Sequence, residues 1–481
     1  MKKIIYSLLA VAALTLSSCE DFTDLQPKGK NLLTTTDQLE MLLNAEVSSC
    51  SSDMRQMAGD MIYAYSNIAT TISQPVKTRG VIIWTYDEAS MDKMAELTAN
   101  DGDYSTFYGY IGTISNPILT KIDEASGSEA AKKQIKCEAL ALRAYSFYML
   151  INKFAKAYDP STAANTPGII LMTEDKDIQT PQPKSTVEEV YTQILKDINE
   201  AIDLGGLPDV AVNRMRLCKP AAYAIKALTL LNMQKWDEAE EAAKQALAIN
   251  GAVNDYNNAY QGTTSGYVIG NTYSVINRGQ KGTDEDYFYD NSFEFYNCYT
   301  PETMANFEDG HAYKEKMSCA NMAYDYMMDA SESILGEPGF NITYDLNSRW
   351  NDGGLRSTQM YLAIAECETH KGNFDTAMEY LDKVRINRID PAKYQPLKGT
   401  VSTEKDAIAH VKQVTLNEDI YSSFIFIDKK RWNQLDGWKQ SYSRTLAGKT
   451  YTIAPDCKMW IFPFPMSVMN NNDKITQNYN E

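Results

Sequence analysis

Histidine is the scarcest ionisable residue in this chain of 481 residues, with only three copies. His311, His370 and His410 lie far apart, and none belongs to an HExxH or nucleophile-elbow motif. His370 falls in a predicted turn, where we expect it to be exposed to solvent. Carboxylates are plentiful, but abundance does not establish the pair of acids that glycoside hydrolysis requires. The sequence therefore predicts a protein that is not an enzyme.

Basic residues are in deficit. Lys and Arg together number 46 and Asp and Glu number 63, which gives a formal net charge of −17. Binding to a phosphate backbone needs an excess of Lys and Arg, so this charge argues against a nucleic-acid partner. The same charge disfavours direct adhesion to anionic lipid. Any attachment to a membrane must therefore be covalent or occur through a partner.

Cysteine motifs for metal binding are lacking as well. None of the eight cysteines forms a CxxC pair, so a zinc site has little support, and we expect neither a metal nor a cofactor. The run Asn100–Asp103 resembles part of a calcium loop, but it lacks the alternate ligands and terminal Glu of an EF-hand, and we expect only a turn. If Cys19 is modified, seven cysteines remain, which excludes a complete disulfide framework. The spacing alone does not say whether Cys298 and Cys319 pair.

Only one long apolar run is present, the thirteen residues Ile4–Leu16, and it follows Lys2 and Lys3. It is too short to span a bilayer as a permanent helix and is typical of a secretory signal. The run leads into Leu-Ser-Ser-Cys19, which resembles the bacterial lipoprotein box. We expect residues 1–18 to be a lipoprotein signal peptide and Cys19 to carry the lipid. The alternative is an ordinary signal peptide followed by a coincidental cysteine.

Residues 19–36 contain few apolar side chains and include Pro27 and Gly29, so we expect a lipidated N-terminal tether. Acidic residues directly after Cys19 resemble the surface-export signal of Bacteroidetes lipoproteins. The expected location is the outer membrane, where a lipid anchor holds a protein that faces the cell exterior.

Tyrosine is in excess, with 31 copies against 14 Phe and 6 Trp. Its ring offers a stacking face and its hydroxyl a hydrogen bond, so an excess suits a wet binding surface. The alternative is tyrosine packed between helices with the hydroxyl at the rim.

Two stretches share one helical pattern. In Lys219–Asn250, apolar and small residues recur on two faces that are interrupted at Gln234–Lys235, and Arg356–Asn387 repeats this order. The order is that of a tetratricopeptide repeat, so both stretches predict antiparallel helix hairpins. Trp236 and Phe374 occupy core positions of the pattern and should be buried.

Two other segments lack a helical period, about 73–103 and 251–350, and both are rich in aromatic and polar residues. We expect them to be loop-rich insertions on the ligand face of a single domain, 37–481. Aromatic rings stack on the C–H faces of sugars, while amides, Arg and carboxylates bind the hydroxyls. Packing, or contact with a transporter, is the alternative for each candidate. The candidate ligand-binding residues are Arg79, Trp84, Tyr86, Asn100, Tyr104, Tyr273, Tyr287, Tyr289 and Tyr296.

Five segments, in order, resemble signatures of the SusD/RagB family of Bacteroidetes outer-membrane lipoproteins. They are Glu138–Phe154 (family pattern EAxxLRAYxYFxLxxxF), Thr166–Leu171 (GIPLV), Gly354–Arg388 (ending LNxVRxRA), Asn417–Trp438 (ERxxELxFExxRWxDLxRW) and Phe462–Asn478 (FPIPxxE…LxQNPGY). The chain departs from these patterns at Phe426–Asp428, where the family has a Phe-Glu-Gly-like turn, and at Asn478–Glu481, where it has NPGY. Both departures fall on framework positions.

The resemblance implies a mainly α, monomeric protein with four tetratricopeptide-like helix pairs in a superhelical frame and long loop-rich insertions. Such proteins sit on a SusC-like TonB-dependent outer-membrane transporter, and their best-known ligands are oligosaccharides. The predicted function is a cell-surface nutrient-binding lipoprotein that captures an oligosaccharide and delivers it to that transporter. The alternatives are a peptide-binding RagB-like lipoprotein and a repeat scaffold that binds only a protein partner.

Overall fold

The computed structural model places most of the chain beyond residue 32. The residues it describes are 33–44, 53–59, 62–63, 66–174, 180–263, 266–269, 284–289, 297–317, 335–337, 339–343, 351, 353–420 and 422–481. Outside them lie the predicted signal peptide 1–18, Cys19, most of the predicted tether 19–36, Tyr273, Tyr296 and Cys319. Among the described residues, no helix combines the length and the apolar character needed to cross a bilayer.

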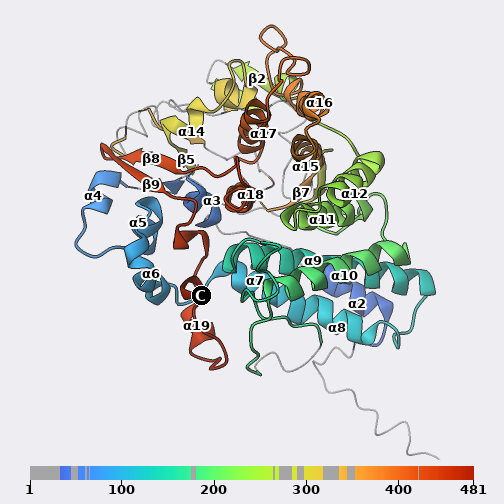
Figure 1. Ribbon diagram of the computed structural model, residues 1–481. Helices are drawn as coiled ribbons and strands as arrows, with labels where there is room; N and C mark the ends of the chain where they lie inside the picture. Colours follow the sequence, from blue (N-terminus) through green and yellow to red (C-terminus); the bar gives the residue numbers. More distant parts are fainter. Residues whose placement is uncertain are drawn as a thin grey trace, which may run out of the picture.

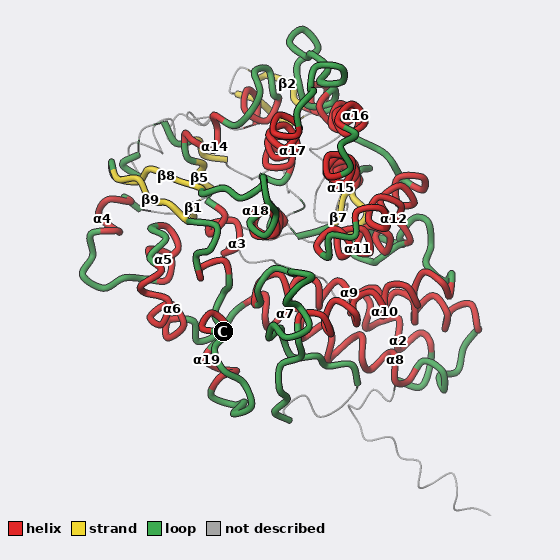
Figure 2. Tube along the Cα trace, viewed as in Figure 1, coloured by secondary structure: helices red, strands yellow, loops and turns green. Residues whose placement is uncertain are grey.

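Helices dominate the described part of the chain and the strands are short (Figure 1; Figure 2). The long helices are α9 (Glu129–Phe154), α10 (Val187–Leu204), α11 (Lys219–Asn232), α12 (Trp236–Ile249), α15 (Ser357–His370), α16 (Phe374–Arg385) and α17 (Glu404–Glu418). The shorter helices are α2 (Thr36–Leu43), α3 (Asp53–Ala58), α4 (Ile68–Ile72), α5 (Arg79–Trp84), α6 (Met91–Leu97), α7 (Gly102–Tyr110), α8 (Asn116–Lys121), α13 (Tyr256–Ala259), α14 (Pro301–Ala305), α18 (Phe424–Trp432) and α19 (Met466–Met469). The predicted mainly α fold class is confirmed.

Helix α9 is the longest described helix, and α10 packs along it. Nearly every residue of α9 from Ile135 onward is buried, so one polar face cannot be read from its sequence. A capping box starts α10: the Thr186 hydroxyl accepts from the Glu189 amide at 3.2 Å, and the Glu189 carboxylate accepts from the Thr186 amide at 2.8 Å. Arg143 of α9 donates to both carboxylate oxygens of Asp197 of α10, each at 2.7 Å, which fixes the two helices together.

Both predicted hairpins are present, as α11–α12 and α15–α16. Gln234 turns the first with φ of 61°, and Gly372 turns the second with φ of 79°. Helix α10 packs on α11, α12 packs on α15, and α17 packs on both α15 and α16. The hairpins α9–α10, α11–α12 and α15–α16 therefore follow one another in space, and α17 extends the series (Figure 1).

The expectation that His370 is exposed is wrong. Its imidazole lies between two indoles, with ring centroids 3.9 Å from Trp236 and 4.9 Å from Trp438. Trp236 and Phe374 are half-buried, so they cover the edge of the helix frame and do not fill its centre. The tryptophan at position 438 comes from a segment far away in sequence, and the repeat pattern alone gave no sign of it.

The segment 73–103 is not the loop that its sequence suggested. It contains α5 and α6, separated by a turn of 3-10 helix. The Thr78 hydroxyl accepts from the Val81 amide at 3.3 Å and so caps α5. The four residues Val81–Trp84 are all buried, and a helix this short and apolar shows no amphipathic period.

The described parts of 251–350 contribute short antiparallel strands, and the helices there are only a few residues long. Strand β5 pairs with β1 and β6, β4 pairs with β7, β2 pairs with β3, and β8 pairs with β9. The strands are β1 (Ile62–Tyr63), β2 (Tyr260–Thr263), β3 (Gly266–Ile269), β4 (Asp286–Phe288), β5 (Asn297–Tyr299), β6 (Asn341–Thr343), β7 (Leu355–Arg356), β8 (Tyr442–Leu446) and β9 (Lys449–Ile453).

The C-terminal segment is fastened to the end of α9. The Phe462 amide donates to the Lys153 carbonyl at 3.0 Å. The Asn478 side-chain amide donates to the Phe462 carbonyl at 2.8 Å and also to the Phe154 carbonyl. The Phe154 and Phe464 rings stack with centroids 5.8 Å apart. These contacts give the terminal sequence motif a structural role, because the Phe462 backbone amide and the Asn478 side chain bind the last carbonyls of the longest described helix.

Candidate functional site

A groove of about 830 Å³ lies between α7, the extended segment 170–174, residues 180–182 and α19. Gly168 lies just before the groove segment 170–174. A Cβ at this position would lie 2.9 Å from the Ser185 carbonyl oxygen, so only glycine lets the chain around residue 168 approach the chain around Ser185 this closely. Sites for small ligands usually measure some 300–1,000 Å³. The groove is therefore large enough for a short oligosaccharide.

Two tyrosines one helical turn apart form a wall of the groove. The Tyr104 and Tyr108 rings lie 4.5 Å apart with an angle of 44° between their planes, and both side chains are half-buried. The Tyr108 hydroxyl donates to the Ile170 carbonyl at 2.8 Å. The Tyr104 ring meets Phe154 and Phe464 edge to face, at centroid distances of 5.5 and 6.1 Å. The pair is thus held in place before any ligand arrives.

Burial raises the pKa of both hydroxyls above the ordinary value for tyrosine. Both tyrosines therefore stay neutral and keep their O–H at physiological pH. The O–H of Tyr108 is already donated to the Ile170 carbonyl, so Tyr108 offers a ligand its ring. Tyr104 offers both the apolar face of its ring and a neutral phenol.

The other walls of the groove are polar and nearly uncharged. The Asn472 side-chain amide donates to the Gln182 carbonyl at 2.8 Å, and its oxygen accepts from the Lys474 backbone amide at 3.1 Å. The Asn471 side-chain amide donates to the Ser467 carbonyl at 2.7 Å and keeps its oxygen as an acceptor for a ligand. Among the described lining residues Glu174 is the only charged one. The remaining hydroxyl groups come from Ser105, Thr113, Thr173, Thr180 and Ser467, and Gln182 adds a further side-chain amide.

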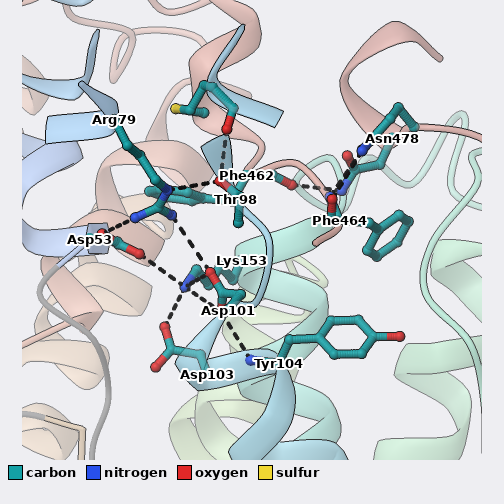
Figure 3. Close-up of polar contacts among 12 residues, drawn as sticks. Asp53, Arg79, Thr98, Asp101, Asp103, Tyr104, Lys153, Phe462, Phe464 and Asn478 are labelled. Atoms are coloured by element: carbon teal, nitrogen blue, oxygen red, sulfur yellow. Dashed lines mark hydrogen bonds and ion pairs between the residues drawn. The ribbon is translucent and has the colours of Figure 1, made fainter. Parts of the chain in front are cut away.

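The start of α7 is held by a buried ammonium group (Figure 3). The Asp101 carboxylate caps α7 by accepting from the Tyr104 amide at 3.0 Å. Lys153 donates to both oxygens of Asp101 at 2.9 and 2.8 Å and to Asp103 at 2.6 Å, and it lies 3.6 Å from Asp53. Burial lowers the pKa of Lys153, but these carboxylates raise it by more, so the ammonium stays charged.

Arg79 completes this cluster. It lies 2.5 Å from Asp53 and 3.6 Å from Asp101, and its Nε donates to the Thr98 hydroxyl at 3.0 Å. Two cations thus face three carboxylates, and the acidic run Asn100–Asp103 binds a lysine of the protein itself. In the described part of the chain no group of three or more His, Cys, Asp or Glu side chains could hold a metal ion.

Tyr104 is the predicted site residue that lies in the groove. Trp84 is buried, and its indole N–H donates to the Gln56 side-chain oxygen at 2.7 Å. Tyr86 is buried with φ of 48°, and its hydroxyl accepts from Arg444 at 2.6 Å. Both aromatic side chains are packed, which was the alternative to an exposed stacking surface. That Trp84 and Tyr86 contact a ligand stays a prediction.

The remaining candidates are spread over the molecule. Asn100 is exposed just before α7. Tyr287 and Tyr289 are buried beside β4, where the Tyr287 hydroxyl donates to the Asn250 carbonyl. The groove residues that sequence reasoning missed are Tyr108, Gln182, Asn471 and Asn472. Only Tyr108 had a detectable signal, because it stands four positions after Tyr104 and so lies on the same face of a helix.

Residues 21–231 match the model of a family described as "Starch-binding associating with outer membrane", SusD-like_3. Over these residues the chain is similar to the SusD-like family. Its fold agrees with that of solved SusD-like structures over nearly its whole length, as the following comparisons show. No curated protein matches the sequence.

A SusD-like carbohydrate binding protein from Bacteroides vulgatus is 18% identical and superposes with a TM-score of 0.64, covering 92% of this chain and 97% of that chain. A SusD superfamily protein from Bacteroides thetaiotaomicron is 17% identical with a TM-score of 0.64, covering 92% of this chain and 99% of that one. Surface glycan-binding protein A from Bacteroides uniformis is 14% identical with a TM-score of 0.62, covering 93% of this chain and 100% of that one. At these identities the likeness shows the SusD-like fold.

Proposed function

We propose that this SusD-like protein captures an oligosaccharide at the cell surface and delivers it to a SusC-like transporter in the outer membrane. The observation that carries the proposal is the groove between α7 and α19, where Tyr104 and Tyr108 stand opposite neutral amides and hydroxyls. The family description, starch binding in association with the outer membrane, supports the same ligand class.

The groove suits a neutral sugar. Tyrosine rings can cover the C–H face of a pyranose, and the half-buried position of Tyr104 and Tyr108 leaves part of each ring accessible. The amides of Asn471 and Asn472 supply groups that pair with hydroxyls in either direction. We expect modest affinity and release of an unchanged ligand, because delivery to a transporter requires dissociation.

We further propose that Arg79, Asn100, Tyr273 and Tyr296 are additional ligand contacts, and that Cys19 carries the lipid anchor. With residues 1–18 removed and 19–36 acting as a tether, the folded part 37–481 would be held on the exterior of the outer membrane. A transporter of the SusC type is then the protein partner.

The test is a glycan array followed by calorimetry on the protein without residues 1–19. Binding to at least one neutral oligosaccharide, with no products formed, is the expected result. Binding to peptides with silence on every glycan would move the protein to the peptide-binding branch. If the protein retained the transporter in a pull-down but bound neither glycans nor peptides, the alternative of a repeat scaffold that binds only a protein partner would replace the proposal.

A further inference from the structure

A second cavity, of about 430 Å³, lies away from the groove. It is bounded by the segment that follows α9, by the end of α18, and by residues 455–461 and 479–481. Its lining differs in charge from that of the groove, because lysines reach it from three separate segments: Lys156, Lys430 and Lys458. Lys156 and Lys458 are exposed at its rim.

Lys430 is the unusual member of this lining. Its side chain is buried, with 3% exposed, and its ammonium donates to the backbone carbonyls of Asn152, at 2.8 Å, and Ala155. In the described part of the chain no carboxylate lies within ion-pair distance of it. Burial alone lowers the pKa of Lys430 to about 7.

Several other buried cations of this protein have acidic partners. Lys153 faces aspartates, and Arg431 pairs with Glu366 and Asp428. A cation buried without a counter-ion carries a desolvation cost that such pairs partly offset. Within the described ranges Lys430 has no such pair and donates to backbone carbonyls, as the buried Lys412 also does.

Capping of α9 explains part of this arrangement. Asn152 and Ala155 lie at the C-terminal end of that helix, where a positive charge interacts favourably with free carbonyls. An ammonium group has three N–H donors, and the two carbonyls take two of them. The third N–H donor of Lys430 has no acceptor among the described residues, and Lys430 lines the cavity.

The carboxylates of the cavity are turned to other partners. Asp159 accepts from the amide and the hydroxyl of Ser161, at 2.8 and 2.7 Å. Glu481 is ion-paired with Lys184. Asp456 is exposed. None of them neutralises Lys430.

We propose that this cavity is a second binding site, which takes a carboxylate or another anionic group of a small ligand, and that Lys430 donates its third N–H to that group. The hydroxyls of Thr162 and Thr166 and the amide of Gln434 line the same space and could bind the neutral part of the ligand. An anion bound here would supply the missing counter-charge, and the hydrogen bond between two charged groups would be a strong one. An acidic sugar and a free inorganic anion share this chemistry.

The test is calorimetry in a low-chloride buffer with D-galacturonate, its neutral counterpart D-galactose, and inorganic phosphate. We expect D-galacturonate to bind and D-galactose to bind at least tenfold more weakly at this site. If phosphate binds and Lys430→Met abolishes that binding, the cavity is an anion site that takes free anions. Failure of both anions to bind, or equal binding of galactose and galacturonate, would overturn the proposal.

Lys430→Met should weaken anion binding about tenfold or more, as expected for the loss of a hydrogen bond between charged groups. Because Lys430 has no acidic partner, methionine leaves no unpaired charge behind, and the variant should fold. Lys412→Met is the matched control. Lys412 is also a buried lysine that donates to a backbone carbonyl, that of Trp438, but it does not line the cavity. Equal loss in both variants would contradict the assignment to Lys430.

A second variant keeps Lys430 in place. Gln434 is exposed, lines the cavity and follows Lys430 by four positions, in the turn just after α18. Gln434→Glu adds a carboxylate that competes with the ligand, so anion binding should fall about tenfold. Undiminished binding in this variant would also count against the site. Tyr104→Ala, in the groove, should leave anion binding unchanged, which separates this inference from the proposed glycan capture.

Discussion

The ammonium group of Lys153 donates to both carboxylate oxygens of Asp101, at 2.9 and 2.8 Å. This contact joins the end of the longest described helix, α9, to the residue that caps α7. Since α7 carries Tyr104, the frame of the protein and the wall of the groove are connected through one buried charge pair (Figure 3). The position of the proposed ligand-binding tyrosines thus depends on a contact between segments that are remote in sequence.

Lys153→Met should destabilise the protein by about 3–5 kcal/mol, because it removes the buried ammonium that pairs with the buried carboxylates of Asp101 and Asp103. Urea unfolding would measure the change. Lys132→Met is the control on the same helix: Lys132 pairs with Glu129 at the surface, at 3.1 Å, and its loss should cost no more than about 0.5 kcal/mol. Equal stability of the two variants would contradict a structural role for the buried cluster.

Tyr104→Ala should weaken glycan binding about tenfold or more, because it removes one ring from the wall of the groove. Tyr108→Ala should act in the same direction. Tyr451 is half-buried on β9 and does not line the groove, so Tyr451→Ala should bind like the wild type. Calorimetry with the best ligand from the array checks all three. Full affinity in Tyr104→Ala would remove this groove from the proposed function.

Asn478→Ala should lower the free energy of unfolding by about 1–3 kcal/mol, because the carbonyls of Phe154 and Phe462 lose their donor in a buried place. Asn480 is exposed two positions further on, and Asn480→Ala should change little. Thermal or urea unfolding distinguishes the two. If both variants unfold alike, the terminal motif does not fasten the chain as described.

The stability of the protein should fall between about pH 4.5 and pH 2 through Glu366. Burial raises the pKa of this carboxyl, but the charge of Arg431 outweighs burial and lowers the pKa to about 2. A carboxyl whose pKa is lower in the folded state binds fewer protons there, so it stabilises the fold above the unfolded pKa and loses that effect as the pH falls. At about 1.4 kcal/mol for each pKa unit, the loss is about 3 kcal/mol.

Unfolding free energies of Glu366→Gln and wild type across this pH range would measure that contribution. The variant is expected to be less stable at neutral pH and to show a shallower acid dependence. Glu404→Gln, at an exposed position on α17, should keep the wild-type dependence. An unchanged acid dependence in Glu366→Gln would show that this carboxyl does not carry the effect.

Sequence reasoning placed the hairpins α11–α12 and α15–α16 correctly because their apolar residues recur with the period of a helix. It failed at α5, whose residues Val81–Trp84 are buried without a polar face. Trp84 and Tyr86, which the sequence suggested as candidate ligand-binding residues, are both buried. A sequence reports that a ring is present, but not that Gln56 and Arg444 bind its polar atom.

The sequence by itself determined that this is a helical protein with repeated helix pairs, an acidic charge and segments that resemble SusD-like signatures. Periodicity and local motifs are properties of neighbouring residues, so the chain alone displays them. The tertiary structure decided which residues meet: Tyr104 with Tyr108 and the α19 segment, His370 with Trp438, and Lys430 with a cavity and no acid. Such contacts depend on how segments distant in sequence pack together, and that packing depends on the shapes of all the side chains that the fold buries.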